Sequence, residues 1–597
     1  MTKAVEAFAA EWAALTGASR IELVGPEDEA RLTEEALSAG EVQPVFGHRY
    51  YARSYVKDTA RSEERTFVST SSERDRGVYN NWRFAADLKP RVMSLMEGAS
   101  RGKTMYVIPY LMSNPGSPLA PWAAGVELTD SRLVVLHMLR MTRVGLSYLG
   151  GGGGFVKGVH VTGDLEHLGQ GTPDDRRHFV TVADERLIIH FGSSYGGNAL
   201  LAKIAHGLRQ ASYDGWRSGR FLAEQFMLIG VHDRLTGETS YIAGGFPSAS
   251  GKTNLAMLVP PPPLDQRYEV QFLGDDIAWM YVDEADGRLY AMNPEYGVFG
   301  VAKDTNERTN PNAMRAIGPD TGTLFTNTAY NPATQDVWWE GKTEVPPRGG
   351  GWLDWRGQAI PEAPLGGRDG ATQEEWSHPN SRFTTALKNV PNLSPRWQDP
   401  KGVPLDAIIF GGRVRRREPL VRAILDLADG VYDGLTLGAE ATAAAEGKAG
   451  VLRYDPMSMR PFLSYGEGDY ARHWLDVLGR ARERPIFAHV NWFQRDESGA
   501  YLWPGYGENL RALLWLLDLK AGRVKGCETP VGVIPAPGEL NLEGLDIPAS
   551  RLERLLRYDP EEWRPEVESR REHLRQFERL PEEIWKAHER LAEAVGA

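Results

Sequence analysis

The sequence predicts an α/β protein of two domains, the second of which carries a P-loop-type nucleotide site. Residues 241–245 form a β-like run, a loop of small residues follows, and Gly251-Lys252-Thr253 opens an apolar segment at helical spacing. Residues 268–279 have the pattern of a second strand, which ends in two acids. At 597 residues the chain is too long for one ordinary core, and this length favours two large domains.

The loop before residue 252 has the chemistry of a phosphate-binding loop. Small residues let backbone N–H groups face phosphates, and the following helix presents its positive N-terminus. Lys252 supplies a point charge, and the hydroxyl of Thr253 can bind Mg²⁺. The loop is not a regular Walker A, because Phe246 stands where that pattern has glycine and Pro247 follows it. A loop that contains Gly-Lys-Thr by chance is therefore the alternative.

Two aspartates, Asp275 and Asp276, close the second predicted strand. A carboxylate at the tip of a neighbouring strand is what a nucleotide–metal site requires, because Mg²⁺ and Mn²⁺ prefer hard oxygen ligands. A turn with two solvated aspartates is the alternative. Together, the loop and the acids favour phosphoryl transfer.

Composition excludes several classes of partner. The hydrophobic content of 42% and the charged content of 25% are typical of a soluble globular protein. The net charge of −12 argues against a nucleic-acid partner, and the chain has no apolar run of membrane length. A single cysteine, Cys527, excludes an internal disulfide framework and fits the reducing cytoplasm. We therefore expect a cytoplasmic protein with small-molecule partners.

The first half of the chain supplies the expected N-terminal domain, residues 1–220. Residues 1–40 have a helical pattern, and residues 105–112 and 134–138 have the pattern of buried elements. Residues 187–192 form a strand, and the turn at 193–198 then leads into a helix start. This arrangement suits a carboxylate or phosphate, or is a plain βα turn.

The second half, residues 221–597, is the expected nucleotide-binding domain, with the P-loop at 246–254. Residues 408–410 form a strand that leads into a basic turn, in which one arginine could bind phosphate. Residues 438–450 are either a short Ala-rich helix or a mobile lid with glycine hinges. Aromatic residues cluster at 491–493 and 501–509, which suits purine stacking or a packed surface hairpin, and 550–597 have an amphipathic helical pattern.

Six motifs occur together and in order: 246–257, 274–279, 378–383, 440–446, 489–493 and 502–509. From about residue 45 to about residue 515 the chain resembles the GTP-dependent phosphoenolpyruvate carboxykinase family. This resemblance implies a two-lobed fold, with an N-terminal substrate-side lobe, a P-loop-type nucleotide lobe and a mobile lid. It also implies conversion of oxaloacetate and GTP to phosphoenolpyruvate, CO₂ and GDP with Mg²⁺ and Mn²⁺, usually by a monomer.

The resemblance also implies roles for individual residues. Those expected to contact the carboxylic-acid substrate are Arg61, Tyr195, Gly196, Gly197, Ser248, Asn380 and Arg382. The nucleotide would contact Ala249, Ser250, Gly251, Lys252, Thr253, Asn254, Arg382, Arg413, Phe493, Tyr501, Tyr506 and Asn509. The catalytic set would be Arg61, Lys203, Ser250, Lys252 and Arg382, and the metal would be held by Thr253, Asp275, Asp276 and, weakly, Gln225.

The chain departs from the family pattern at three of these places. Ser250 replaces a reactive loop cysteine that is not a nucleophile in the reaction. The family binds Mn²⁺ through an aspartate, a lysine and a histidine; Asp276 is present, but Ile204 and Gln225 stand at the other two positions. One carboxylate and one amide make a poor Mn²⁺ site. Nearby lone histidines, His206 and His232, are more often structural than ligands.

Three hypotheses remain open from the sequence. The first is a carboxykinase with a remodelled metal site, and the second is a GTP-dependent kinase of the same fold that acts on a different small carboxylic acid. The third is a silent nucleotide-binding homologue, against which the retained phosphate-facing charges argue. We place the family reaction first because so many motifs match.

Overall fold

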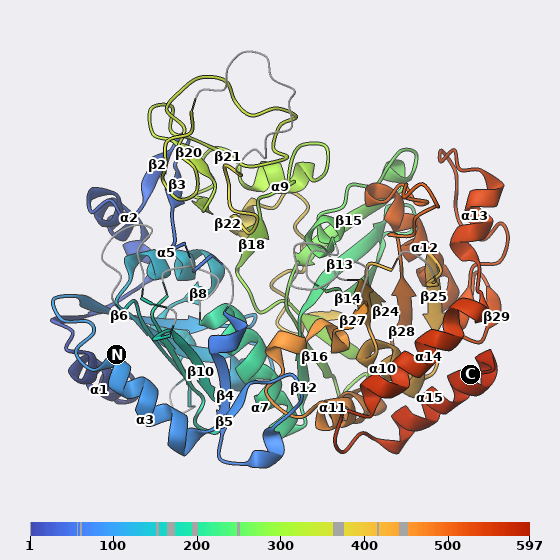
Figure 1. Ribbon diagram of the computed structural model, residues 1–597, viewed down its shortest axis with the longest axis horizontal. Helices are drawn as coiled ribbons and strands as arrows, with labels where there is room; N and C mark the ends of the chain where they lie inside the picture. Colours follow the sequence, from blue (N-terminus) through green and yellow to red (C-terminus); the bar gives the residue numbers. More distant parts are fainter. Residues whose placement is uncertain are drawn as a thin grey trace. The chain divides into compact units, whose positions relative to one another are not determined.

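The computed structural model describes residues 2–56, 58–59, 62–150, 154–163, 172–173, 175–193, 201–247, 251–361, 375–414, 417–440 and 452–597 (Figure 1). The chain packs into two compact units. The first comprises Met1–Glu73, Asn81–Gln210 and Pro294–Leu393, and the second comprises Arg74–Asn80, Ala211–Asn293 and Ser394–Ala597. Both contain helices and sheets, which confirms the predicted mixed α/β class. The predicted single division at residue 220 stays a prediction. In packing, residues 294–393 belong to the first unit.

The first unit is built on a nine-stranded mixed sheet. Its strands run in the order β1 (Arg20–Leu23), β6 (Thr104–Leu111), β7 (Ala124–Thr129), β9 (Val156–Val161), β11 (Leu187–Phe191), β10 (His178–Val182), β4 (Thr66–Thr70) and β5 (Trp82–Phe84), with β8 (Arg143–Val144) beside β6. Strand β1 lies inside the stretch predicted to be helical. It forms because it pairs in parallel with β6, a contact that local helical periodicity cannot report.

Helices α1 (Lys3–Thr16) and α3 (Ala85–Met96) contribute to the core of this sheet. The hydroxyl of Thr2 accepts the N–H of Val5 at the start of α1, and Gly17 ends the helix in the left-handed region. Phe8 and Trp12 are buried from α1 together with β6, β7 and β11 side chains. The other described helices of the unit are α2 (Glu29–Ser38), α4 (Ala120–Ala123), α5 (Arg132–Met141), α9 (Pro311–Ala316) and the π-helix η6 (Ala202–Gln210).

A five-stranded sheet completes the first unit. Its order is β18 (Gly297–Val301), β22 (Arg382–Ala386), β19 (Leu324–Thr326), β3 (Arg49–Ala52) and β2 (Gln43–Val45). The hairpin of β20 (Ala329–Asn331) and β21 (Asp336–Trp338) opens a tryptophan-rich excursion, in which Trp338 and Trp352 form a small separate core. Residues 340–361 therefore pack around indole rings rather than in regular elements.

The second unit contains an eight-stranded sheet and a four-stranded one. The larger has the order β15 (Tyr268–Gly274), β13 (Phe226–Asp233), β14 (Glu238–Gly245), β24 (Ala407–Gly411), β28 (Ile486–Val490), β25 (Val421–Ile424), β30 (Gly532–Ile534) and β29 (Cys527–Thr529). The smaller has β12 (Phe221–Glu224), β16 (Ala278–Val282), β17 (Leu289–Met292) and β23 (Val403–Pro404). Strands β26 (Gly438–Glu440) and β27 (Leu452–Tyr454) form a separate hairpin pair.

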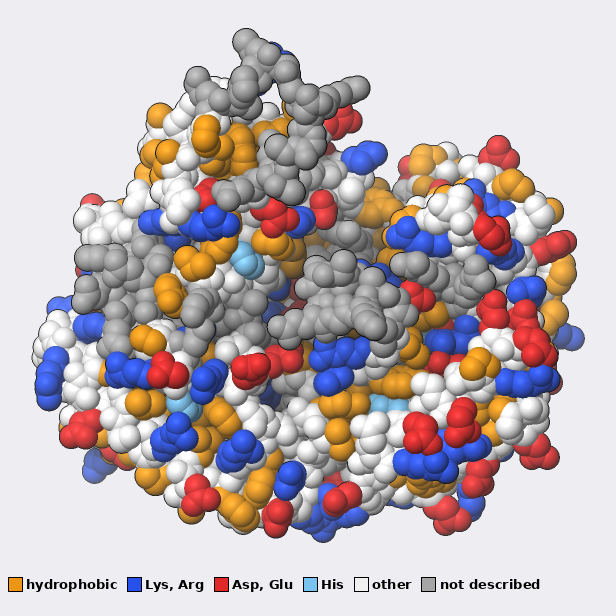
Figure 2. All heavy atoms as spheres, viewed as in Figure 1, with side chains coloured by type: hydrophobic (Ala, Val, Ile, Leu, Met, Phe, Trp, Pro, Cys, Tyr) orange, Lys and Arg blue, Asp and Glu red, His pale blue; other side chains and the backbone are white. Residues whose placement is uncertain are grey.

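The helices of the second unit pack on both of its sheets. They are α7 (Ala211–Ser218), α8 (Lys252–Ala256), α10 (Leu427–Leu435), α11 (Glu467–Gly479), α12 (Asn509–Lys520), α13 (Ala549–Leu556), α14 (Pro560–Leu574) and α15 (Glu582–Val595). Figure 1 shows α10, α14 and α15 together. Helices α13, α14 and α15 confirm the helical prediction for 550–597. In the described residues, no helix is both long enough and apolar enough to cross a bilayer. Acidic and basic side chains are interspersed over the face in Figure 2.

A buried ionic cluster ties α10, α14 and β25 together. Arg422 lies 2.5 Å from Asp433 and 2.8 Å from Glu418, and Arg570 lies 3.4 Å from Asp433. Nδ1 of His489 is 2.9 Å from the second Asp433 oxygen. Burial alone would raise the pKa of Asp433, but the Arg422 charge and the His489 contact hold it well below its usual value. The carboxylate is therefore charged at neutral pH.

Removing that charge should destabilise the chain. Asp433→Asn takes one carboxylate away from the buried Arg422 and Arg570 guanidinium groups and leaves Glu418 as the remaining carboxylate beside Arg422, and we expect a loss of about 3–5 kcal/mol in the free energy of unfolding. Asp426 is the matched control because it caps α10 at the surface, and Asp426→Asn keeps a capping oxygen, so its change should stay below about 0.5 kcal/mol. Urea unfolding of both variants tests this, and equal losses would contradict it.

Buried neutral histidines predict acid sensitivity. Burial lowers the pKa of His137, His206 and His473 to about 3 from an ordinary 6.5. The unfolded chain therefore takes up protons below pH 6.5 before the folded chain does, so stability is full above pH 6.5 and falls as the pH drops toward 3. Each histidine contributes up to about 1.4 kcal/mol per pH unit in that window. Urea midpoints at pH 7 and pH 5 should differ, and equal midpoints would contradict this assignment.

Candidate active site

Asn380 joins two stretches of the first unit that are far apart in sequence. Its side-chain N–H donates to the carbonyl of Thr59 at 2.8 Å. Its oxygen accepts two N–H groups of Arg382, at 2.7 Å and 3.1 Å. The Arg382 guanidinium also lies 5.0 Å from the ring centre of Phe299. The structure thus brings two predicted substrate residues together, beside the segment that leads to residue 61.

Lys203 belongs to the π-helix η6, where the N–H of His206 donates to the carbonyl of Leu201. Its ammonium donates to Glu295 at 2.6 Å, and the two side chains are 4% and 1% exposed. The lysine charge is therefore balanced inside the first unit. Ile204, the next residue, is half-buried and offers no donor atom. π-Helical segments are rare in proteins, and those that occur are frequently found at functional sites.

The predicted strand and helix are confirmed on the two sides of residues 248–250, and those three loop residues lie outside the described part of the chain. Strand β14 ends at Gly245, and α8 begins at Lys252 after Gly251, whose φ of 83° favours glycine. Phe246, at the position where a Walker A loop has glycine, is 1% exposed and stacks on Trp492 with ring centres 6.0 Å apart. A Cβ on Gly411 would lie 2.4 Å from the Phe246 ring, so a glycine there makes room for it.

Polar and charged groups of α8 and of the turn after β15 contact one another. Nζ of Lys252 lies 2.7 Å from Asp276, and the two side chains are 11% and 20% exposed. The Thr253 hydroxyl donates to Asp275 at 3.2 Å. The structure therefore confirms that a Gly-Lys-Thr helix start adjoins a strand that ends in two acids. An ammonium, a hydroxyl and two carboxylates are gathered at one helix N-terminus.

Gln225 lies at the bend between β12 and β13, and its carbonyl is 3.2 Å from Nζ of Lys252. The hydroxyl oxygen of Ser458 is 2.6 Å from the Phe246 carbonyl and 3.2 Å from the Gln225 side-chain oxygen. The Ser458 hydroxyl donates over the shorter contact, and the Gln225 side-chain oxygen is the second, longer partner of the same hydroxyl. The Gln225 side chain is therefore engaged with a serine.

Arg413 follows β24 in the basic turn, and its carbonyl accepts the N–H of Glu440 at 2.8 Å. Gly412 and Gly438 approach so closely that a Cβ on the former would lie 2.3 Å from the carbonyl oxygen of the latter. Burial lowers the pKa of the half-buried Arg413 guanidinium, but its high ordinary value keeps it charged. Strand β26, where the predicted lid begins, is therefore attached to this turn.

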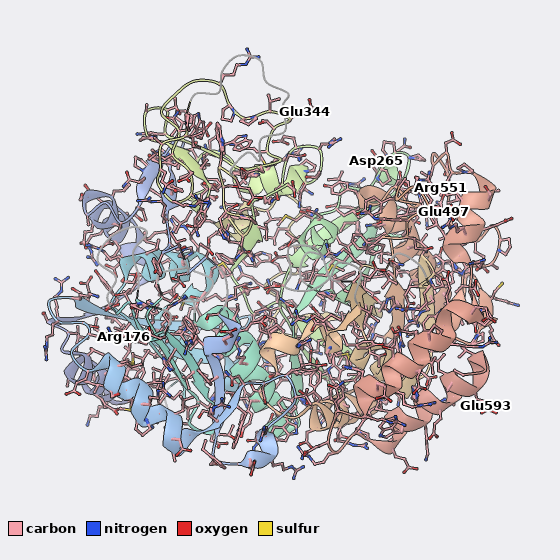
Figure 3. All side chains as sticks on the ribbon, viewed as in Figure 1. Arg176, Asp265, Glu344, Glu497, Arg551 and Glu593 are labelled. Carbon is pink, nitrogen blue, oxygen red and sulfur yellow. The ribbon has the colours of Figure 1, made fainter. Side chains whose placement is uncertain are left out.

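Phe493 and Tyr501 of the predicted aromatic cluster lie together near α13. The rings of Phe493 and Tyr501 are 6.4 Å apart, and Arg495 lies 4.1 Å over the Tyr501 ring. Arg551, labelled in Figure 3, donates to the Tyr501 carbonyl. Tyr501 is 46% exposed, so its ring is accessible for stacking. Tyr506 is half-buried at a φ of 54°, and its hydroxyl has no hydrogen-bond partner within the described structure.

Trp503 fixes the orientation of Asn509. Its indole N–H, which can only donate, lies 3.0 Å from the Asn509 side-chain oxygen. That oxygen must therefore face the indole, and the amide N–H₂ group points away from it. Both residues are buried, which keeps this arrangement in place. Asn509 is thus presented as a donor.

Comparison with known proteins identifies the family. Residues 7–216 match the model of the phosphoenolpyruvate carboxykinase N-terminal domain, and residues 221–594 match that of the C-terminal P-loop domain. The chain belongs to the GTP-dependent phosphoenolpyruvate carboxykinase family. A relative from Anaeromyxobacter sp. (strain K), named phosphoenolpyruvate carboxykinase [GTP], is 42% identical over 582 residues, which are 96% of this chain and 93% of the relative. Proteins of that name from Chlamydia muridarum (42%; 88% of this chain, 86% of the relative) and Renibacterium salmoninarum (40%; 99% and 96%) are also similar.

Some residues predicted from the family resemblance lie outside the described part of the chain. They are Arg61, Tyr195, Gly196, Gly197, Ser248, Ala249, Ser250 and most of the predicted lid, 441–450. Asn254 is described and exposed on α8. Their predicted roles, like those of the other site residues, stay predictions.

Three contact partners of the predicted site residues were missed from the sequence. Glu295 pairs with Lys203, Ser458 holds the phosphate-loop carbonyl, and Trp503 orients Asn509. Glu295 follows a buried strand in Asn293-Pro-Glu295, a placement that could have marked it as a strand-end acid. Ser458 carries no comparable signal, because its contact spans more than two hundred positions.

Orientation of Asn509 should set base preference in this family member. An amide N–H₂ can donate to the O6 acceptor of guanine but meets the N6 donor of adenine unfavourably. Trp503→Phe frees the amide to turn, so we expect the affinity ratio of GDP to ADP to fall about tenfold, the worth of one hydrogen bond.

Trp515 provides the matched control, since it is equally buried in the second unit and donates to Glu539. Trp515→Phe should leave the ratio within about twofold, because it does not contact Asn509. Calorimetric titration with both nucleotides measures the ratio. A similar change in the two variants would show that indole loss acts through general destabilisation.

Proposed function

We propose that this chain catalyses the GTP-dependent phosphoenolpyruvate carboxykinase reaction: oxaloacetate and GTP give phosphoenolpyruvate, CO₂ and GDP. The observation that carries the proposal is the phosphate loop, in which Lys252 and Thr253 adjoin Asp275 and Asp276 within a chain similar to such enzymes along nearly its whole length. A guanine nucleotide and a small carboxylic acid are therefore the partners we assign, and we assign neither a nucleic acid nor a membrane as a partner.

The chemistry needs no general base. Loss of CO₂ from oxaloacetate leaves its bonding electron pair on the enolate, and the enolate oxygen then attacks the γ-phosphorus of GTP as the bond to GDP breaks. Lys252 and Arg413 offset charge on the transferred group, and Arg61 and Arg382 hold the acid through paired N–H groups. The segment at 438–450 excludes water, since a free enolate would otherwise be protonated to pyruvate.

The remaining residues of the proposed site follow the same division. Tyr195, Gly196, Gly197, Ser248 and Asn380 serve the substrate, and Ala249, Ser250, Gly251 and Asn254 serve the phosphates. Phe493 and Tyr506 sandwich the base, and Tyr501 and Asn509 contact it. Lys203 belongs to the proposed catalytic set, and its ammonium is paired with the buried Glu295 carboxylate.

The residues fit a magnesium ion carried by the nucleotide. The Thr253 hydroxyl and the Asp275 carboxylate lie 3.2 Å apart at the start of α8, and both are hard oxygen donors. When bound, the ion neutralises charge on the β- and γ-phosphates. Thr253 and Asp275, with Asp276 beside them, are the residues that would hold it.

The donors do not fit the family's second metal, the Mn²⁺ bound by aspartate, lysine and histidine. Asp276 is paired with Lys252, Gln225 contacts Ser458, and Ile204 is aliphatic. Within the described ranges no group of three or more His, Cys, Asp or Glu side chains is placed to hold a metal. We propose that the chain has diverged at this position and that Mg²⁺ is its working ion.

This divergence favours a second candidate function. The lost ligands lie on the acceptor side of the family reaction, while the nucleotide-side charges are kept. A GTP-dependent kinase that acts on another small carboxylic acid would use the same phosphate loop. A nucleotide-binding homologue without activity is less compatible with the retained Lys252, Asp275 and Asp276.

We also propose that residues 1–220 form a substrate-side domain and 221–597 the nucleotide-binding domain of a monomer. The matches to separate N-terminal and C-terminal family models support this functional division. In packing, residues 294–393, which include Asn380 and Arg382, join the first unit. The unit that contains the proposed substrate-side domain therefore also includes these two side chains from later in the sequence.

An assay with GTP, oxaloacetate and either Mg²⁺ or Mn²⁺ tests the reaction. We expect phosphoenolpyruvate with Mg²⁺ alone. GTP turnover only with another acid would replace the first function by the second, and nucleotide binding without turnover would overturn both.

The metal assignment has its own test. The double variant Ile204→Lys with Gln225→His restores the family's donor types, so we expect Mn²⁺ affinity of the nucleotide-free chain to rise at least about tenfold. Electron paramagnetic resonance of free Mn²⁺ measures it without turnover. The single variant Gln225→His is the control and should gain less. Tight Mn²⁺ binding by the unaltered chain would contradict the assignment.

A further inference from the structure

A buried ion pair joins two loops of the first unit. Arg177 contacts the carboxylate of Asp58, and its Nε–H donates to the carbonyl of Gly192 at 3.1 Å. Ser193, the next residue, donates its hydroxyl proton to the same carboxylate, whose two oxygens are both 3.1 Å away. The side chains of Arg177 and Asp58 are 1% and 2% exposed. The contact is therefore internal and well shielded from salt.

His160 holds the other side of Ser193. Its Nε2 is 2.7 Å from the Ser193 carbonyl oxygen, and its Nδ1 is 2.7 Å from the hydroxyl of Thr129. Since a carbonyl only accepts, Nε2 carries the proton and Nδ1 accepts the Thr129 hydroxyl. Burial lowers the pKa of His160, which agrees with a neutral ring. The hydroxyl and the carbonyl of Ser193 are thus both held by hydrogen bonds.

This arrangement is not explained by stability alone. A buried ion pair often contributes no more to stability than apolar residues of similar volume would, because its desolvation cost offsets its attraction. What a charged pair supplies is a defined geometry, since a guanidinium and a carboxylate match only in a few orientations. Arg177 directly precedes β10, and Asp58 lies in a segment without regular structure. The pair therefore fixes a loop against the residue that leads into β10 of the nine-stranded sheet.

Three stretches of the proposed substrate site adjoin this anchor, either in sequence or through the contact of Asn380. Thr59 follows Asp58 directly and precedes Arg61 by two positions, and its carbonyl accepts from Asn380, which holds Arg382. Ser193 lies two positions before Tyr195. We propose that Asp58, Arg177, Ser193 and His160 are positioning residues for the substrate carboxylates. The inference deepens the proposed function and rests on it.

The sharpest test removes one hydroxyl. Ser193→Ala deletes the donor to Asp58 without creating a buried charge and without much change in volume. Ser100→Ala is the matched control, because Ser100 is as buried, lies in the same unit and donates to the buried carboxylate of Asp130 at 3.0 Å. Both variants should lose similar thermal stability.

We expect kcat/KM for oxaloacetate to fall about 10- to 100-fold in Ser193→Ala, since small misplacement of binding groups costs that much. The KM for GTP should not change, and Ser100→Ala should keep kcat/KM within about threefold of the unaltered chain. Equal losses in the two variants would overturn the proposal. So would a parallel rise in the KM for GTP, because the effect would then not be confined to the carboxylate site.

Binding of oxalate, a small dicarboxylate, separates this inference from the proposed function. We expect calorimetry to show weaker oxalate binding in Ser193→Ala than in Ser100→Ala, whether or not the unaltered chain forms phosphoenolpyruvate. Absence of turnover with oxaloacetate would end the carboxykinase assignment alone. Equal oxalate affinities in the two variants would end the positioning role alone.

Discussion

The ion pair between Lys252 and Asp276 is the contact on which the nucleotide side of this protein depends. It joins the first residue of α8 to the turn after β15, two elements that chain connectivity alone would not bring together. The ammonium has three N–H donors, and Asp276 and the Gln225 carbonyl use two of them. In the proposed function, a phosphate in the loop and the Asp276 carboxylate would share the charge of this one ammonium.

The substrate side is organised by a different constraint. Its proposed side chains come from four distant parts of the sequence, and among those described, Arg382 is the first residue of β22 while Asn380 precedes that strand. Asn380, which precedes β22, donates to the carbonyl of Thr59. Arg177 holds the same loop through its ion pair with the neighbouring residue, Asp58. Fixing loops by buried polar contacts gives a defined geometry without a large apolar core beneath them.

Local patterns allowed much of the nucleotide side to be predicted. The strand before Phe246, the helix start at Lys252 and the acids after β15 are adjacent in sequence, so their order alone indicates their chemistry. Contacts between remote residues could not be predicted in this way. Glu295 meets Lys203 across more than ninety positions, and β1 was concealed in a helical pattern because only its pairing with β6 makes it a strand. The family resemblance supplied roles for residues but none of these supporting contacts.

The ring of Phe246 has a consequence for how this nucleotide loop can evolve. It fills space left by Gly244 and Gly411 and rests on Trp492, so these four side-chain positions are sterically interdependent. Replacing the phenylalanine by the glycine of a Walker motif would open a void beneath the loop, and enlarging either glycine would push the ring out. The two kinds of phosphate loop therefore differ at several interdependent positions, and exchanging one for the other without a void or a clash needs changes at more than one of them.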